Sequence, residues 1–568
     1  MEQLRLILIA GLALVGVLLY QAWQEATLPA QAATPATASP FDAAPEVPTP
    51  GPAPTVAAGD APPAVPQPVE PEATGPASVA ASDEEDAGSV WVQTDVYEAR
   101  ISLRGADLKE VRLREHRRSA EDDSPPLALL NDSRRRFFVA QSGIVSAEGA
   151  SPLHTSVWEY QGPKRVSLAD GGEQLPLRFT WRDASGREVQ RTYHFARGSY
   201  EIEVSQTLVN QGEAEWVASP YWRYVRNADG GNGDVPFVAT FTGVGMYALD
   251  DGSYRFRKHD LDDLGDEPVT LSQPGGWTAM MEHYFLAAII PPAQEQNNLY
   301  ARPSKIADFL TEYVAEPVRV AAGARAEHAV RLYLGPKLQN ELGAVSPGLE
   351  LTIDYGLLTP ISEPLFWVMD KFHDLTGNWG WSIILVTLLV KGLFFKLSEA
   401  QYRSMARMKK FAPRIQQLKE RYADDRQRLH QAMMDLYQKE GFNPLAGCWP
   451  LLVQFPVFIA LYWVLLESVE LRQADFIGYL NDLSSPDPYF VLPVLFGISM
   501  FVQQRLSGSA MTMDPMQQRI MNAMPIMLTA FFAFFPVGLV LYWLVSNLIG
   551  IAQQWLIMKR LDREGLRK

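Results

Sequence analysis

A lysine stands inside one of the most apolar stretches of the chain. In WSIILVTLLVKGLFFKL (residues 381–397), Lys391 is surrounded by leucine, valine and phenylalanine. A cation inside a membrane-spanning helix is costly unless it is paired, hydrated or able to reach the interface. Thr387 lies one helical turn earlier on the same face, and Lys396 already marks the nearer end of the stretch. We therefore predict that Lys391 faces inward, into a hydrated recess.

Several other apolar segments also carry polar side chains that would lie at membrane depth. Taken singly, each is typical of a hydrogen bond between helices, worth on the order of 1 kcal/mol. Together, and beside a buried lysine, they favour a hydrated cavity over a dry bundle. The residues are Gln454, Gln503, Gln504, Ser546 and Asn547.

The sequence contains no pattern that indicates a catalytic site. We find no glycine loop that could cradle a phosphate, no metal-ligand cluster and no nucleophile paired with a base. We interpret His283, in GGWTAMMEHYF, as structural. The single cysteine, Cys448, excludes an intrachain disulfide and is interpreted as a small buried apolar residue. The sequence therefore predicts no enzyme, no cofactor and no metal site.

Six apolar segments can position the polar groups in a membrane. Residues 4–20 are just long enough to span a bilayer, and no small-x-small cleavage site follows at once, so we interpret them as an uncleaved anchor. The last two segments are separated only by Pro536 and must form a tight hairpin. The five segments after the anchor are 379–397, 445–466, 489–506, 522–535 and 537–557.

Charge is distributed unevenly along the chain. From Thr376 onward there are 20 Lys and Arg against 14 Asp and Glu, a net charge of +6, whereas the whole chain carries −15. The part before Thr376 therefore carries −21. Basic loops stay in the cytoplasm, which predicts that the 398–444 loop, the 559–568 tail and both termini lie there. The acidic part then falls on the periplasmic side of a bacterial inner membrane.

The composition and the pattern of apolar residues change along the part of the chain that precedes the second span. Residues 24–88 are rich in Pro and Ala without apolar periodicity, which is typical of a tether. Residues 89–345 alternate polar and apolar side chains in runs such as SYEIEVSQTLVN, with turn clusters at 183–186 and 229–232. This alternation predicts a large antiparallel β-sandwich. Apolar residues at helical spacing over 361–375 predict an amphipathic helix at the membrane surface.

The 398–444 loop predicts two helices. Pro413 suits the first position of a helix, and Asp424 with Gln427 resembles a capping box that opens a second helix. The charge on one face is consistent with topology and lipid binding, or with a docking surface for ribosomal RNA. The basic residues of this face are Arg403, Arg407, Lys410, Arg414, Lys419 and Arg421.

The predicted fold is a polytopic α-helical membrane protein with six spans, a large all-β periplasmic sandwich and a cytoplasmic helical hairpin. Its parts follow one another along the chain. They are the 1–23 signal-anchor span, the 24–88 periplasmic linker, the 89–345 sandwich, the 346–377 linker and interfacial helix, the 378–397 second span, the 398–444 hairpin, the 445–558 spans three to six, and the 559–568 basic tail.

Long motifs of the second half resemble the bacterial members of the YidC/Oxa/Alb insertases. They are NWGWSIILVTLLVKG, EAQYRSMARMKKFAPRIQQLKERYADDRQRL, NPLAGCWPLLVQFPVFIALYWVLLESVELRQADF, DPMQQRIMNAMP and FPVGLVLYWLVSNL. RGSYEIEVSQTLVN, GGWTAMMEHYFLAAIIP and LYLGPK resemble the periplasmic part of the long, Gram-negative-type members.

The resemblance implies an insertase that helps inner-membrane proteins enter the bilayer, fold and assemble, alone or with the Sec translocon. A five-helix core would surround a hydrophilic groove open to the cytoplasm and to lipid. Its positive charge would attract acidic residues in the short translocated tail of a client. Lys391 stands where the family usually has arginine, which keeps the charge but loses the rigid guanidinium fork.

The resemblance also suggests contacts and partners. We expect the ribosome and the signal-recognition receptor to dock on the hairpin and the tail, and the Sec accessory complex to contact the sandwich. The lipid bilayer and nascent inner-membrane proteins complete the expected partners, with no small-molecule substrate. The expected groove or client contacts are Thr387, Gln454, Gln504, Trp543 and Asn547, with Trp543 replacing a common tyrosine.

Two other functions are compatible with parts of the sequence. A secondary transporter for a small solute would also need a buried cation, but it usually has paired inverted repeats, which five spans do not display. A membrane-tethered carbohydrate-binding protein would suit a large β-sandwich. It would need an acidic pair or an aromatic platform, and it would leave the polar spans unexplained.

Overall fold

The computed structural model describes residues 88–121, 123–146, 150–228, 241–422, 425–439, 449–507 and 515–563. All of them belong to one compact unit, residues 64–568. The predicted anchor and nearly all of the tether, with Asp424, Cys448 and the turn cluster at 229–232, lie outside the described residues.

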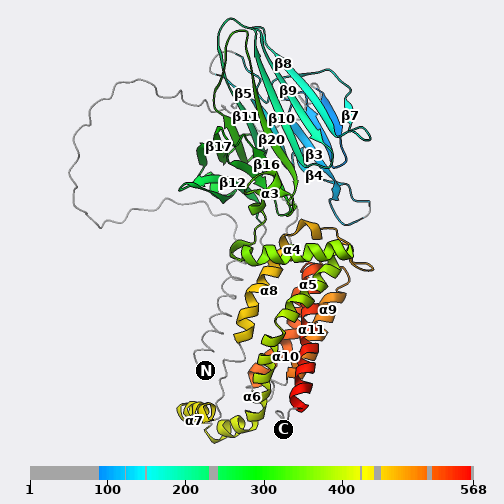
Figure 1. Cartoon of the computed structure of the whole chain (residues 1–568), viewed down its shortest axis with the longest axis vertical. Helices are drawn as coiled ribbons and strands as arrows, with labels where there is room; N and C mark the ends of the chain where they lie inside the picture. Colours follow the sequence, from blue (N-terminus) through cyan, green and yellow to red (C-terminus); the bar gives the residue numbers. More distant parts are fainter. Residues whose placement is uncertain are drawn as a thin grey trace, which may run out of the picture. The chain divides into compact units, whose positions relative to one another are not determined.

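Two sheets form the β-domain (Figure 1). The first has 11 strands, in the order β14-β17-β18-β11-β5-β4-β3-β2-β1-β7, with β19 paired to β11. All its pairs are antiparallel except β1 with β7. Its strands are β1 (Ser89–Gln93), β2 (Tyr97–Ser102), β3 (Leu108–Arg117), β4 (Pro126–Ser133), β5 (Arg136–Val145), β7 (Arg165–Ser167), β11 (Trp216–Arg226), β14 (Val269–Pro274), β17 (Gln296–Pro303), β18 (Phe309–Ala315) and β19 (Val318–Val320).

The second sheet has nine antiparallel strands, in the order β13-β12-β15-β16-β20-β10-β9-β8-β6. Its strands are β6 (Glu159–Tyr160), β8 (Gln174–Arg182), β9 (Arg187–Ala196), β10 (Glu201–Asn210), β12 (Gly243–Asp250), β13 (Ser253–Asp260), β15 (Trp277–Met281), β16 (Phe285–Ile290) and β20 (Arg325–Pro336). Short 3-10 turns also occur, at Asp263–Gly265, Leu349–Thr352 and Gly356–Leu358, with a one-turn helix α3 (Leu342–Val345).

The predicted alternation of buried and exposed side chains is confirmed in β10, whose second, fourth, sixth, eighth and tenth residues are buried. The turn at 183–186 is confirmed as well. The carboxylate of Asp183 accepts hydrogen bonds from the backbone N–H groups of Ser185 (3.0 Å) and Arg187 (2.9 Å), and Gly186 takes a left-handed conformation, φ 84°. Strand β11 differs, because nearly all of its residues are buried. On the face away from the second sheet, Tyr221 and Val225 of β11 pack in small apolar clusters, and Arg223 donates to Gln141 (3.0 Å).

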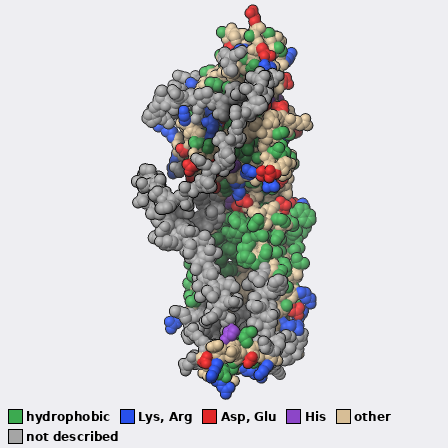
Figure 2. All heavy atoms as spheres, turned by 90° about the vertical axis from the view of Figure 1, so that its left-hand side faces the viewer, with side chains coloured by type: hydrophobic (Ala, Val, Ile, Leu, Met, Phe, Trp, Pro, Cys, Tyr) green, Lys and Arg blue, Asp and Glu red, His purple; other side chains and the backbone are tan. Residues whose placement is uncertain are grey.

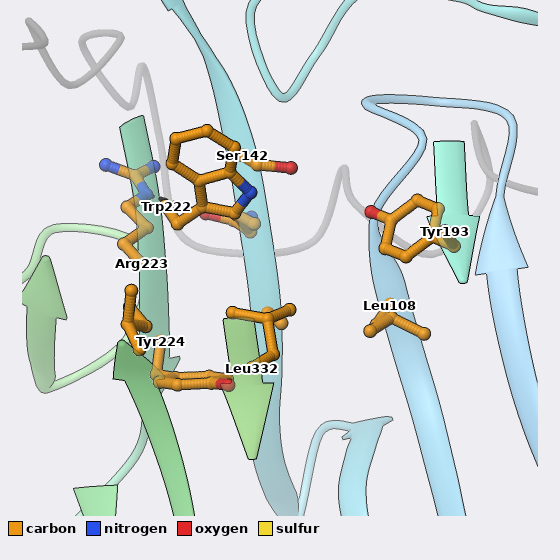
Figure 3. A pocket seen from close by; sticks show the side chains of 10 residues that line it. Leu108, Ser142, Tyr193, Trp222, Arg223, Tyr224 and Leu332 are labelled. Atoms are coloured by element: carbon orange, nitrogen blue, oxygen red, sulfur yellow. Dashed lines mark hydrogen bonds between the residues drawn. The ribbon is translucent and has the colours of Figure 1, made fainter. Parts of the chain in front are cut away.

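The interior between the sheets is closely packed. The cavity in Figure 3 has room for about 10 Å³, enough for one water molecule. Its walls come from both sheets, through Leu108, Trp222 and Tyr224 on one side and Tyr193 and Leu332 on the other.

The helical region follows the β-domain. Helices α5, α8, α9, α10 and α11 pack together and α4 crosses one end of them (Figure 1). The helix predicted over 361–375 is present as α4, whose last residue is Thr376 and whose C-cap is Gly377 (φ 63°). Its place at the membrane surface stays a prediction. The helices are α4 (Thr359–Thr376), α5 (Trp379–Leu393), α6 (Phe395–Arg421), α7 (Arg426–Lys439), α8 (Trp449–Glu467), α9 (Val491–Ser507), α10 (Pro515–Phe532) and α11 (Val537–Arg563), with a 3-10 turn η5 (Val469–Leu471).

Two local predictions for the 398–444 loop are wrong. Pro413 lies inside α6 and does not begin a helix, since α6 runs on from the preceding apolar segment without a break at this residue. The cap of α7 is Asp425, one residue after the predicted Asp424: its carboxylate accepts from the N–H of Arg428 at 3.0 Å. With acidic residues adjacent in the sequence, spacing alone could not select the one that caps.

Hydrophobic side chains form a band on the surface of the helical region (Figure 2). Among the described residues, Val537–Leu561 of α11 is long and apolar enough to cross a membrane. Trp379–Leu393 and Phe395–Ser404 together form a second candidate, bent by 60°. Val453–Glu467, Val491–Leu506 and Asn522–Phe532 are shorter apolar helices. The predicted count of six spans therefore stays a prediction.

Polar contacts join the β-domain to the segment between α8 and α9. The side chain of Gln473 accepts from the N–H of Arg117 (3.1 Å) and donates to its carbonyl (2.7 Å), like one rung of a β-ladder. Gln339 donates to Glu470 (3.1 Å). Burial raises the pKa of Glu470 to about 7 and lowers the pKa of Lys337, which lies near Glu467, to about 8. We call these contacts the junction.

Five histidines of the β-domain, including His259, have pKa values lowered by burial, and the four with the largest shifts remain neutral in the folded state. The pKa falls to about 4 for His116 and His328, and to about 3 for His154 and His283. An unfolded chain protonates each of them below its ordinary pKa of about 6.5. The stability that neutral histidine contributes is therefore lost as the pH falls from about 6.5 toward the folded value.

Replacing His328 with Gln should weaken this acid sensitivity. Lowering the pH from about 7.5 to about 5.5 should cost the wild type about 1.4 kcal/mol more of its free energy of unfolding than H328Q. Urea titration followed by circular dichroism at the two pH values measures the difference. H430Q, at an exposed position of α7, is the control and should match the wild type. An equal loss in H328Q and wild type would mean that His328 is not kept neutral by folding.

Candidate functional site

Helix α5 breaks just after Lys391. The helix ends at Leu393, and the first turns of α6 leave it at an angle of 60°. Gly392 lies at the break, and a Cβ there would have no heavy atom within 4 Å. Lys391 is half-buried beside this opening. The break thus brings the lysine to an open side of the helical region.

A cavity of about 260 Å³ lies next to the break. Helices α5, α8 and α11 form its walls, and its polar lining includes the side chains of Lys391, Gln454 and Ser546. Among the described residues, no carboxylate forms an ion pair with Lys391. The described residues that line it are Val390, Lys391, Phe394, Gln454, Phe455, Val457, Phe458, Tyr542 and Ser546.

This arrangement brings together two of the predicted groove residues. Lys391 and Gln454 come from segments more than sixty positions apart and share the cavity. An ammonium beside an amide and a hydroxyl can bind anionic groups by charge-assisted hydrogen bonds. Because apolar side chains complete the walls, the attraction between the ammonium and an anion is screened less than at a fully exposed surface.

Thr387 lies one turn before Lys391 but does not line the cavity. Its side chain is 1% exposed, and its hydroxyl donates to the carbonyl of Ile383 at 2.6 Å. A threonine in a helix commonly satisfies its hydroxyl in this way. The polar face of α5 therefore begins at Lys391, and Thr387 packs inside the helices.

Trp543 lies in an aromatic cluster beside the cavity. Its ring centroid is 4.0 Å from that of Phe532, and it stacks on Phe458 at 6.3 Å. Phe458 also lines the cavity. The indole N–H of Trp543 has no hydrogen-bond partner in the described part of the chain. The members of this cluster are Phe458, Tyr462, Phe496, Phe532, Phe535, Tyr542 and Trp543.

Asn547 and Gln504 are placed away from the cavity lining. The Asn547 amide donates to the hydroxyl of Ser499 at 2.7 Å, which joins α11 to α9. Gln504 is half-buried on α9. Any role of these two residues, or of Thr387 and Trp543, in contacting a client stays a prediction.

One residue that the sequence analysis missed touches Lys391 directly. The amide of Gln553 on α11 donates to the backbone carbonyl of Lys391 at 2.9 Å. Ser546 and Gln553 are seven positions apart and so share a face of α11. Because Ser546 is one of the polar residues singled out in the sequence, a second polar residue seven positions later was the signal that could have identified Gln553.

The basic face of α6 is described only in part. Arg403 forms an ion pair with Glu399 at 3.5 Å, and the side chains of Arg414 and Arg421 are exposed. The side chains of Arg407, Lys410 and Lys419 lie outside the described residues.

Known proteins match the chain over nearly all of the part described above. Residues 89–368 match the family described as YidC periplasmic domain, and residues 371–564 match the family described as 60Kd inner membrane protein. The membrane protein insertase YidC of Nitrosococcus oceani is 41% identical over 572 residues, which cover 100% of both proteins. That of Methylococcus capsulatus is 45% identical over 86% of this chain and 88% of the relative.

The chain belongs to the family of YidC membrane protein insertases. Members of this family are inner-membrane proteins with a periplasmic domain, and the family is not a family of enzymes. The β-sandwich described above is therefore periplasmic. The transporter and carbohydrate-binding alternatives are not favoured.

Two solved structures are similar to parts of the chain at a low level. An active YidC insertase with its first transmembrane domain resolved is 17% identical and covers 82% of this chain and 91% of its own, with a TM-score of 0.37. A galactose mutarotase-like protein from Lactobacillus casei is 13% identical over 44% of this chain and 100% of its own, with a TM-score of 0.29. Neither likeness bears on the chemistry of this chain.

The contact between Asn547 and Ser499 should stabilise the helical region. N547A should lower the free energy of unfolding by about 1 kcal/mol, a usual value for a hydrogen bond between membrane helices. Thermal unfolding in detergent micelles, followed by circular dichroism, compares N547A, S499A and the double variant. The double variant should lose less than the two single losses added together. Strict additivity would contradict the hydrogen bond.

Proposed function

We propose that the cavity lined by Lys391 and Gln454 is the groove through which this insertase receives its clients. The observation that carries the proposal is the lysine itself: a half-buried cation, without an ion pair among the described residues, in a cavity of about 260 Å³. A cation in such a place is costly unless water or an anion reaches it. An acidic side chain near the end of an incoming chain supplies that anion.

Water in the groove lowers the cost of moving a short polar tail across the membrane. The tail meets the ammonium of Lys391 and the amide of Gln454 in place of bare hydrocarbon. The apolar helix of the client then moves along the outer surface of the spans, driven by burial of its side chains in lipid. Large exposed apolar residues support such a path, namely Phe455, Ile498, Ile526, Met527 and Phe531.

The proposed topology has six spans with both termini in the cytoplasm. The basic α6–α7 hairpin and the tail then lie on the cytoplasmic side, as expected for basic loops. The groove opens toward that side, where clients are synthesised. The bend between α5 and α6 and the short apolar helices α9 and α10 suit a locally thinned bilayer, since short spans favour thinning.

The hairpin and tail are proposed to contact the ribosome and the signal-recognition receptor, and the sandwich to contact the Sec accessory complex. Exposed Arg414 and Arg421 support the first proposal, because ribosomal RNA attracts clustered cations. The Sec translocon is proposed as a partner for clients with long translocated segments.

Changing the charge at position 391 should change which clients insert. K391R should insert a client with an acidic translocated tail as well as the wild type, K391A should insert it less efficiently, and K391E should fail, because like charges repel. Protease protection of the tail in proteoliposomes measures insertion. K396E, at an exposed lysine outside the cavity, is the matched control and should keep activity.

A client whose tail carries lysine in place of its acidic residues completes the design. K391E should insert this client better than the wild type does. Equal insertion of the acidic client by K391E and wild type would overturn the attraction by the groove charge.

Reversing the described charges of the hairpin should weaken ribosome binding. R403E/R414E/R421E should reduce co-sedimentation with ribosomes, and the wild-type binding should fall steeply with added salt. R134E/R135E/R178E carries the same charge change at exposed positions of the β-domain and should bind like the wild type. Equal binding by the two triple variants would argue that the basic face serves topology or lipid binding.

A further inference from the structure

The break between α5 and α6 leaves backbone carbonyls without partners in their own helix, at a depth where the proposed topology places the membrane. The last four carbonyls of a helix lack partners within that helix, and an unsatisfied carbonyl in hydrocarbon is costly. The N–H of Phe394 donates to the carbonyl of Val390 at 3.1 Å. The carbonyl of Lys391 accepts instead from the Gln553 amide at 2.9 Å. A side chain from α11 thus occupies the position where an unbroken helix would place the N–H of Phe395.

Helix α11 also holds the chain on the far side of the break. Gln553 is 8% exposed, and one turn earlier the carbonyl of Gly550 accepts from the hydroxyl of Tyr402 at 3.3 Å. Further along, Ile557 and Leu561 form a small apolar cluster with Ala406 of α6. Both sides of the bend therefore contact α11, and the hydrogen bond between Gln553 and Lys391 lies at the bend itself.

We propose that Gln553 is a positioning residue: its amide caps the Lys391 carbonyl, holds the helix broken after this residue and so directs the ammonium into the cavity. The inference rests on the proposed role of Lys391 as the groove charge. Two partners compete for one carbonyl, the side chain of Gln553 and the N–H of Phe395. If the N–H of Phe395 replaces the Gln553 amide on this carbonyl, α5 and α6 join into a straighter helix. The side chain of Lys391 then rotates with the helix.

Methionine at position 553 tests this competition because it matches glutamine in length but donates no hydrogen bond. Spin labels at 381 and 401 span the bend. Their backbone separation is about 30 Å along a straight helix and about 26 Å with the 60° bend. Q553M should lengthen the distance measured by double electron–electron resonance by about 4 Å, in full-length protein in lipid nanodiscs.

Insertion of the acidic-tailed client should fall by about three- to five-fold in Q553M, the effect of one hydrogen bond between membrane helices. Q416M, at an exposed glutamine of α6, is the matched control and should change neither the distance nor insertion.

A second substitution separates positioning from general damage. Phe395 is the first residue of α6, a position that proline tolerates, and proline has no N–H to offer the Lys391 carbonyl. F395P should therefore keep the bend, and Q553M/F395P should regain both the short distance and insertion relative to Q553M. A variant that merely unfolds would not be rescued by adding proline.

Each result decides the inference. An unchanged distance in Q553M would overturn it, because water or another group would then cap the carbonyl. A longer distance with unchanged insertion would show that the bend does not position the groove charge. If K391E inserts the acidic client like the wild type, the proposed role of Lys391 fails, while the distances in Q553M and Q553M/F395P still report whether Gln553 holds the break.

Discussion

A charged side chain among apolar helices must keep contact with water or with an opposite charge, and the helical region of this protein is arranged around that constraint. Lys391 meets it by lying at a helix break, next to a cavity of about 260 Å³. The break in turn leaves the backbone carbonyl of Lys391 without an intrahelical partner, and Gln553 supplies one. The position of one ammonium group therefore depends on a bend, and the bend on a side chain of another helix.

Helix α11 separates the cavity from the closely packed part of this region. Tyr542 and Ser546 line the cavity, and Gln553 continues the same side toward the helix end. Trp543, the next residue after Tyr542, packs in the aromatic cluster against Phe532. On α5 the boundary lies between Thr387, whose hydroxyl is satisfied within its own helix, and Lys391. Polar and aromatic side chains at adjacent positions thus keep the cavity from extending into the packed interior.

The parts predictable from sequence are those set by short-range periodicity. Alternation predicted β10 and the sandwich, apolar spacing predicted the helix α4, and a lysine in an apolar run predicted that Lys391 faces a cavity, which it shares with Gln454. The break after Lys391 was not predicted, because it depends on a bond from a residue 162 positions away. The Asn547–Ser499 pairing was missed for the same reason. Pro413 was misread because a proline signals a helix start only where the neighbouring segments do not already form a helix.

The β-domain contacts the helical region at the junction, which lies away from the cavity. The junction involves Glu467 and Glu470, at and beyond the end of α8, and Gln473 in a left-handed conformation, φ 57°. Gln454 precedes Glu467 by thirteen residues of helix, about 20 Å. Coulombic effects over that distance are weak once water screens them. Removing the sandwich would expose the junction carboxylates to water, where they are stable as anions. The cavity beside Lys391 would be left intact, because none of the described residues that line it belongs to the β-domain.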